Sequence, residues 1–336
     1  MGAIVDDLIS GINAGDRRAI GQAITLVEST QPEHRNTALG LLKELSPRVG
    51  KSLRVGVTGS PGVGKSTFIE ELGNIAIDQG HHVAVLAIDP TSTLTGGSIL
   101  GDKTRMNRLS TRPEAFIRPS PSGAMQGGVS RRTREAIIVL EAAHFDLILV
   151  ETMGVGQSEI AVTDMTDMLI LLLLPAAGDN LQGIKRGIVE LADLLLVNKA
   201  DGDLKNTALR TVVEYQHALR LLPTRTPNWD VPVRSCSAFH GEGIAEIWSV
   251  IDRYRVATEK SGERARRRAR QAQASLWAEA IETLASRLRA DEKTRRRLVD
   301  LENDVIAGVL PATVAADRLI DDFLEICPDL KAAQSR

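Results

Sequence analysis

The stretch Gly59-Ser60-Pro61-Gly62-Val63-Gly64-Lys65-Ser66-Thr67 decides the fold of this chain. It has the GxxxxGK[ST] spacing of a phosphate-binding loop, directly after an apolar run and directly before a segment with helical spacing. Glycines let the backbone curl until its N–H groups face phosphate oxygens, and the start of the next helix adds positive potential. We therefore expect Lys65 to reach the β- and γ-phosphates of a nucleoside triphosphate and Ser66 to hold Mg²⁺.

The sequence around this loop alternates short apolar runs with helical segments as far as about residue 254. That alternation predicts an α/β fold with a mostly parallel central sheet covered by helices on both faces. Several of the runs are apolar throughout, as expected for strands that are buried on both faces. Strands are predicted at 53–58, 83–89, 147–151, 169–174, 194–198 and 231–235.

Helical segments flank this region on both sides. Apolar residues at helical spacing predict a helical N-terminal extension over 1–50, which precedes a nucleotide-binding domain over 51–256. Residues 257–336 are predicted to form a helical C-terminal arm. The arm opens with a run over 259–270 that holds six basic and two acidic residues. We interpret this run as a solvated helix face in preference to a patch that binds anions or nucleic acid.

Composition restricts the classes of protein. The formal charge of −2 over 336 residues argues against a globally basic nucleic-acid binder. Cys236 and Cys327 lack the spacing of a zinc site, and the two aspartates within 1–7 do not suit a signal peptide. The most apolar stretch, 168–174, is far shorter than the roughly 20 residues that span a bilayer. These features predict a cytoplasmic protein that binds neither nucleic acid nor a membrane.

A second motif follows the predicted strand at 194–198. Asn198-Lys199-Ala200-Asp201 has the NKxD pattern of guanine-nucleotide proteins. Its aspartate can accept hydrogen bonds from the N1–H and N2–H₂ groups of guanine, a donor pair that adenine lacks, so the motif favours GTP over ATP. A strand-to-helix turn with an asparagine cap is the alternative interpretation. After the last predicted strand, Ser237, Ala238 and Phe239 are expected to support the guanine.

Three acidic residues are candidates for the metal site. Asp89 ends a predicted strand at the edge of the sheet where ligands bind, although a turn aspartate beside Pro90 is the alternative. Glu151 stands where many GTPases carry the aspartate of a DxxG motif, and its longer side chain suggests contact with Mg²⁺ through water. Asp102 lies in a polar, glycine-bearing loop, where ordinary loop charges are the alternative interpretation.

With these motifs in this order, the chain closely resembles the methylmalonyl-CoA mutase-associated GTPases of the MeaB/ArgK type over nearly its whole length. The most specific parts of the resemblance are 151–159 and 178–185. The resemblance implies a P-loop GTPase with a helical N-terminal extension and a C-terminal dimerisation arm. It places Asp102 and Glu151 in the apparatus for Mg²⁺ and the γ-phosphate, makes 179–185 a mobile switch, and gives Lys185 the role of supplying charge to the transition state.

The resemblance also implies a function. It suggests a homodimeric chaperone that binds GTP or GDP with Mg²⁺ and serves adenosylcobalamin-dependent methylmalonyl-CoA mutase, gating cofactor loading and protecting the mutase. Hydrolysis is expected to be slow and to be stimulated by the partner, and no cobalamin ligand is expected on this chain. Small departures occur, such as Met153 in place of a typical valine and Asn180 in place of a typical glutamate.

Two other functions stay open at this point. Relatives have been labelled as ATPases or kinases of lysine/arginine/ornithine transport, although the NKxD motif argues against ATP. Other P-loop GTPases insert metals, but these tend to carry His-rich or Cys-bearing motifs. Here the six histidines are scattered, and His81-His82 is the one adjacent pair.

Overall fold

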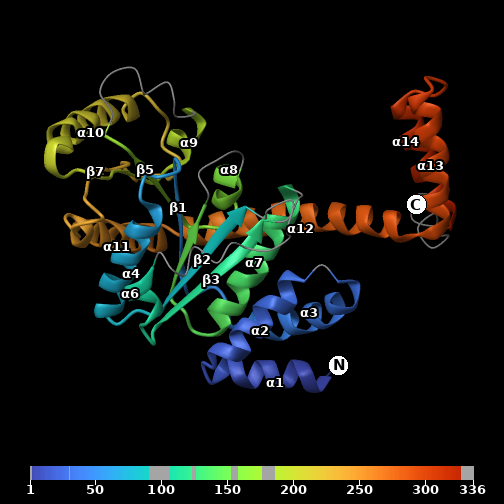
Figure 1. Cartoon of the computed structure of the whole chain (residues 1–336), viewed down its shortest axis with the longest axis horizontal. Helices are drawn as coiled ribbons and strands as arrows, with labels where there is room; N and C mark the ends of the chain where they lie inside the picture. The colour runs from blue at the N-terminus through green and yellow to red at the C-terminus, as the bar shows by residue number, and fades with distance from the viewer. Residues whose placement is uncertain are drawn as a thin grey trace. The chain divides into compact units, whose positions relative to one another are not determined.

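A seven-stranded sheet forms the centre of the first of two compact units in the computed structural model, which describes residues 2–29, 31–90, 106–122, 126–152, 158–175 and 186–326 (Figure 1). The strand order is β3-β2-β4-β1-β5-β6-β7, and every pairing is parallel, which confirms the predicted α/β class. The strands are β1 (Leu53–Gly59), β2 (Val83–Pro90), β3 (Ala115–Ser122), β4 (Leu147–Glu151), β5 (Met168–Leu173), β6 (Leu194–Val197) and β7 (Val233–Ser235).

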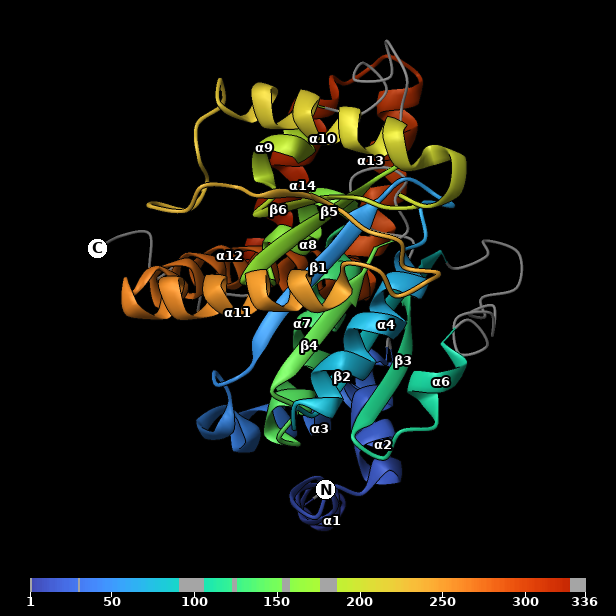
Figure 2. The same cartoon turned by 90° about the vertical axis from the view of Figure 1, so that its left-hand side faces the viewer.

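Helices cover both faces of the sheet, so the first compact unit has two hydrophobic cores (Figure 2). Alternate residues of a strand point to opposite faces. In β2, Val83 and Val85 face the core of α4 (Lys65–Asp78), α6 (Asn107–Ser110) and α11 (Ile244–Lys260). Ala84 and Leu86 face the other core. That second core is formed with α7 (Gln126–Ala142), α8 (Ser158–Thr163), α9 (Arg186–Leu191) and α10 (Lys205–Leu219).

The predicted N-terminal extension is helical, and it joins the core of α7. It consists of α1 (Gly2–Asn13), α2 (Arg17–Glu28) and α3 (Pro32–Leu45), and α2 packs along α7 (Figure 1). Buried Glu28 binds β3, because its carboxylate accepts hydrogen bonds from Arg118 at 2.7 Å and from the Ser120 hydroxyl at 2.5 Å. Arg35 pairs with Glu135 of α7 at 2.6 Å. The extension is therefore part of the first unit.

Strand β3 was missing from the sequence-based prediction, which was wrong on this point. Ala115–Ser122 contains Arg118, Pro119 and Pro121, so it lacks the apolar run by which the other strands were recognised. It pairs with β2 alone, at the edge of the sheet. Proline cannot donate to a second neighbouring strand, and it is tolerated at an edge where no such neighbour exists.

The chain forms two compact units, 1–271 and 272–336. The second unit holds the end of α12 (Glu263–Ala290), with α13 (Glu292–Ile306) and α14 (Ala312–Ile326), around a small core of Leu301, Ala315 and Leu319. The predicted helical character of the C-terminal part is confirmed. The domain limits at 50/51 and 256/257 stay predictions. None of the helices that the structure describes combines the length and apolar character that crossing a membrane demands.

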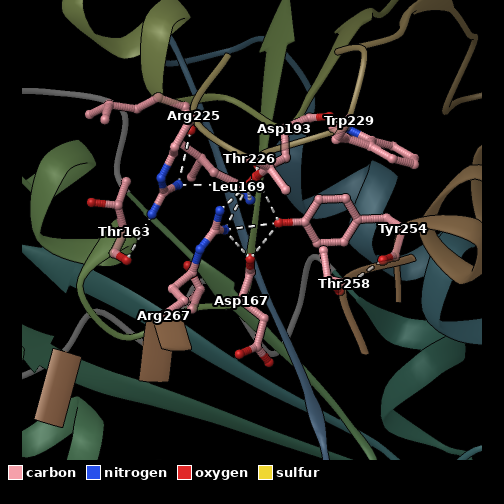
Figure 3. A network of polar contacts seen from close by, with 12 residues as sticks. Thr163, Asp167, Leu169, Asp193, Arg225, Thr226, Trp229, Tyr254, Thr258 and Arg267 are labelled. Carbon is pink, nitrogen blue, oxygen red and sulfur yellow. Dashed lines mark hydrogen bonds and ion pairs between the residues drawn. The ribbon is translucent and has the colours of Figure 1, made fainter. Parts of the chain in front are cut away.

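The interpretation of the basic run 259–270 as a solvated helix face was wrong for its central residues. Arg267 is buried, and its guanidinium pairs with Asp193 at 3.3 Å (Figure 3). Arg268 makes a two-pronged contact with Asp167 at 2.6 and 2.7 Å. These carboxylates lie just before β6 and β5, so the run docks onto the amino-terminal edge of the sheet.

Candidate functional site

The glycine-rich loop lies between β1 and α4, at the carboxyl-terminal edge of the sheet. Gly59 and Gly64 have φ angles of 147° and 96°, a region that favours glycine. A Cβ atom on Gly59 would stand 2.4 Å from the Leu172 carbonyl oxygen, and one on Gly64 would stand 2.6 Å from Nδ2 of Asn198. The loop therefore curls tightly against β5 and the loop after β6, as a phosphate cradle requires.

The side chain of Lys65 lies inside this curl. Lys65 is buried, and its Nζ donates to the carbonyl oxygens of Gly59 at 2.9 Å and Ser60 at 3.2 Å. Of the remaining predicted residues, Pro61, Gly62 and Val63 lie in the same turn, and Ser66 and Thr67 lie in the first turn of α4. An ammonium held at the centre of a glycine-turned loop fits the β- and γ-phosphates of a nucleotide.

Two oxygen-bearing side chains of the predicted metal set meet beside the loop. The Ser66 hydroxyl donates to Oε1 of Glu151 at 2.8 Å. Glu151 ends β4, is 8% exposed, and is followed by Thr152, whose hydroxyl bonds that of Thr58 at 2.8 Å. Hydroxyl and carboxylate oxygens are the ligands that Mg²⁺ prefers, so this pair fits the metal.

The structure does not fully describe the other residues predicted for the metal site and for catalysis. The backbone of Asp89 lies in β2 opposite Pro121, at the carboxyl-terminal edge of the sheet, and nothing further is described of its side chain. Asp102 and Lys185 lie outside the described residues. Their predicted roles stay predictions.

The loop after β6 is bonded to both of its neighbours through Asn198. This buried side chain donates from Nδ2 to the Val63 carbonyl at 2.8 Å, and its Oδ1 accepts from the Ala238 N–H at 2.9 Å. It thereby links the phosphate loop, its own loop and the loop after β7. The helical segments that follow begin at Gly202 and Lys205, so Asn198 is not a helix cap and the alternative interpretation of the motif is wrong.

The predicted base-reading residues lie together in these two loops. Oδ2 of Asp201 accepts a hydrogen bond from the Ser237 hydroxyl at 2.5 Å, which orients the carboxylate. Lys199 has a φ angle of 58°, and the Phe239 side chain is 82% exposed. Cys236 follows β7 and is buried in the core shared with α4 and α11; burial raises its pKa to about 12, so it is a neutral thiol at neutral pH.

The fold and the site define a P-loop protein of the GTPase class. The glycine-rich loop and the NKxD loop both lie at the carboxyl-terminal edge of the parallel sheet, and a hydrogen bond from Asn198 joins them. The chain belongs to the family described as "Methylmalonyl Co-A mutase-associated GTPase MeaB", whose profile matches residues 20–293. Family membership implies binding of a guanine nucleotide, typically with Mg²⁺, and supports GTP hydrolysis.

Individual relatives are similar over nearly the whole chain. "Probable GTPase Rv1496" of Mycobacterium tuberculosis is 49% identical over 94% of each chain. "Methylmalonic aciduria type A homolog, mitochondrial" of Mus musculus is 46% identical and covers 95% of this chain and 79% of its own length. The crystal structure of a protein named "LAO/AO transport system kinase" is 35% identical, with a TM-score of 0.74 over 97% of this chain and 99% of that one.

Proposed function

We propose that this chain is a cytoplasmic GTP-hydrolysing switch protein for an adenosylcobalamin-dependent acyl-CoA mutase, with methylmalonyl-CoA mutase as the first candidate. The observation that carries the GTPase part is the bond from Asn198 to the phosphate loop, which joins the base-reading and phosphate-reading loops in one site. The description of the family and the names of its relatives support the mutase as partner. Two cysteines in 336 residues suit a reducing compartment.

In this proposal the chain's own residues bind and orient the nucleotide. The backbone of 59–67 and the Lys65 ammonium hold the phosphates, and Asp201, oriented by Ser237, accepts hydrogen bonds from guanine. Ser66 and Glu151 hold Mg²⁺, which when bound neutralises charge on the phosphate oxygens. The phosphate loop, which leads into Ser66 at the start of α4, is bonded through Asn198 to the loop that carries Asp201, so the base and the metal are positioned by the same framework.

The remaining catalytic assignments belong to the same proposal. Asp89 and Asp102 complete the metal site, directly or through water, and Lys185 supplies positive charge to the γ-phosphoryl group. In sequence, Lys185 follows β5, whose Leu172 lies against Gly59 of the phosphate loop. A cation that arrives only with the partner would leave basal hydrolysis slow. Cobalamin is proposed to be bound by the mutase and not by this chain.

We also propose that the second unit pairs two copies of the chain. Trp277, Ile281 and Leu284 follow at helical spacing on α12 and are 67, 65 and 52% exposed, although all three are large and apolar. A matching helix from a second copy would cover such a stripe. Sedimentation velocity is expected to show a dimer for the wild type and for Ser286→Glu, an exposed position on the opposite side of α12, but a monomer for Trp277→Glu. A dimer of unchanged stability in Trp277→Glu would overturn this assignment.

The two alternative functions are weaker on specific grounds. The transport interpretation has in its favour the name of the protein whose crystal structure is similar. However, the Asp201 carboxylate, oriented by Ser237, accepts hydrogen bonds from the N1–H and N2–H₂ groups of guanine, a donor pair that adenine lacks. For metal insertion, the described part of the chain holds no group of three or more His, Cys, Asp or Glu side chains that could bind a metal ion.

A hydrolysis assay tests the proposed function. The purified chain is mixed with GTP and Mg²⁺, with and without methylmalonyl-CoA mutase loaded with adenosylcobalamin. We expect slow hydrolysis that rises about tenfold or more with the mutase, since an added cation is worth several orders of magnitude in related reactions. Excess ATP should not compete. An unchanged rate with every adenosylcobalamin-dependent mutase would remove the mutase from the proposal, and equal affinity for ATP and GTP would favour the transport interpretation.

A further inference from the structure

One guanidinium binds the ends of two helices. Arg225, in the connection between α10 and β7, donates from Nη1 to the Leu191 carbonyl at 3.0 Å and from Nη2 to the Thr163 carbonyl at 3.3 Å (Figure 3). Leu191 is the last residue of α9, and Thr163 is the last residue of α8. A planar guanidinium can bridge two acceptors in this way, whereas a lysine ammonium is a single point of charge. Arg225 therefore links the carboxyl ends of α8 and α9.

Side chains from the first turns of α12 contact the same region. Nε2 of Gln271 donates to the carbonyl oxygens of Thr163 and Thr166, both at 2.9 Å. Arg267, one turn earlier, pairs with the Asp193 carboxylate, which Arg225 also approaches at 3.6 Å. Side chains from two distant parts of the sequence, Arg225 on one side and Arg267 and Gln271 of α12 on the other, thus meet around the ends of α8 and α9.

The charges of this cluster make the electrostatic environment of Arg225 depend on the positions of the carboxyl ends of α8 and α9. Two guanidiniums, Arg225 and Arg267, share the single carboxylate of Asp193. Burial, together with the charge of Arg267, lowers the pKa of Arg225 despite the attraction of Asp193. Carbonyl groups at the carboxyl ends of α8 and α9 supply further negative potential. A shift of either helix would thus change the environment of a buried cation.

Both helices follow segments of the proposed nucleotide site. α8 begins at Ser158, seven residues after Glu151, whose carboxylate contacts Ser66. α9 begins at Arg186, directly after Lys185. A change at the nucleotide site that shifts α8 or α9 would therefore be passed to the rest of the unit through the contacts at the carboxyl ends of these two helices.

We propose that Arg225 and Gln271 are positioning residues that couple α8 and α9 to the first turns of α12, so that the nucleotide state is felt at 264–271. The coupling rests on the proposed GTPase function and adds to it a route from the site to the opposite edge of the sheet. Because binding couplings are reciprocal, a ligand or partner that fixes α12 would in turn change nucleotide affinity. α12 continues to Ala290, within the second unit, where a partner could act on it.

Hydrogen exchange of the full-length chain tests this coupling. Exchange of the backbone amides of 264–271 is compared between the GDP state and the state with a non-hydrolysable GTP analogue. The wild type is expected to show a difference in protection between the two states. Arg225→Met and Gln271→Ala should lose most of it, while the matched controls Arg255→Met on α11 and Gln273→Ala on α12 should keep it.

A second readout separates positioning from loss of structure. Arg225→Met is expected to lower kcat for GTP by about fivefold while leaving the Kd for GDP within about twofold, as fits a coupling of modest size. It should fold, because Asp193 keeps Arg267, Thr226 and the Leu169 N–H as partners. Arg225→Lys retains the charge but cannot bridge both carbonyls, so it should show the same loss of coupling.

The outcomes distinguish this coupling from the proposed function. A wild type that binds and hydrolyses GTP but shows equal exchange at 264–271 in both states overturns the coupling alone. So does a full difference that persists in Arg225→Lys and Gln271→Ala. A wild type that fails to bind GTP overturns the proposed function, and the coupling with it.

Discussion

The two edges of the sheet use polar residues in opposite ways. At the carboxyl-terminal edge, polar side chains bond to turned loops: Lys65 to loop carbonyls, Ser66 to Glu151, and Asn198 to two neighbouring loops. At the amino-terminal edge, buried carboxylates face guanidiniums of the same chain. The difference indicates that the amino edge is completed by the protein itself, whereas the carboxyl edge is shaped for a ligand.

The amino edge is a dense network of matched charges. Burying a carboxylate is costly unless it is paired and hydrogen-bonded. Three buried carboxylates, those of Glu141, Asp167 and Asp193, each accept several hydrogen bonds. Asp193, for example, accepts from the Thr226 hydroxyl at 2.5 Å and from the Leu169 N–H at 3.0 Å. The acidic members are Glu141, Asp167 and Asp193, and the basic members are Arg54, Arg225, Arg267 and Arg268.

The largest expected effect is on stability at the amino edge. Asp193→Ala leaves the guanidiniums of Arg225 and Arg267 buried without their shared carboxylate, which should cost about 3–5 kcal/mol of unfolding free energy. Urea denaturation measures this loss. Glu151→Ala, at the other edge, should cost clearly less. Equal losses at the two sites would break the distinction between the edges.

The next effect is on activity at the carboxyl edge. Lys65→Ala removes the ammonium from the phosphate loop and should lower GTP hydrolysis roughly 100-fold, equivalent to about 2.7 kcal/mol of activation free energy. The matched control is Lys51→Ala, an exposed lysine near the amino edge, which should hydrolyse GTP at the wild-type rate. A rate for Lys65→Ala within threefold of the wild type would take Lys65 out of the site.

A smaller effect concerns the choice of base. Asp201→Asn replaces one acceptor oxygen by an amide donor, so affinity for GTP should fall roughly 10- to 100-fold. The same change suits xanthosine triphosphate, which carries a carbonyl oxygen where guanine carries its amino group. Competition with a fluorescent nucleotide gives both affinities. If the relative preference for the two bases stays as in the wild type, Asp201 does not read the base.

The smallest effect is the pH dependence of the amino edge. Burial raises the pKa of Glu141, but hydrogen bonds and charge from Arg54, with help from Ser52 and Arg268, outweigh it and hold the pKa below its ordinary value of 4.5. A depressed pKa contributes stability above the unfolded pKa and loses it as the pH falls through the folded pKa. The difference in unfolding free energy between the wild type and Glu141→Gln should therefore shrink below pH 4.5. A constant difference would show that the charge of Glu141 contributes nothing.

The sequence by itself determined the class of fold and the outline of the nucleotide site. Gly59–Thr67 and 198–201 are local patterns whose chemistry follows from a few adjacent residues, and apolar runs mark strands that are buried on both faces. For the same reason β3 was missed, because an edge strand with prolines carries no such run. The structure also corrected the alternative interpretation of Asn198, whose amide bonds Val63, 135 residues away.

Only the tertiary structure decided what the basic run of α12 does. Arg267 and Arg268 meet Asp193 and Asp167, which are 74 and 101 residues away in sequence. Nothing local distinguishes these arginines from Arg266 and Arg270, which bind Glu263 on the same helix. The physical reason is that parallel strands bring the residues before each strand to one edge, so carboxylates far apart in the chain become a single surface for the helix.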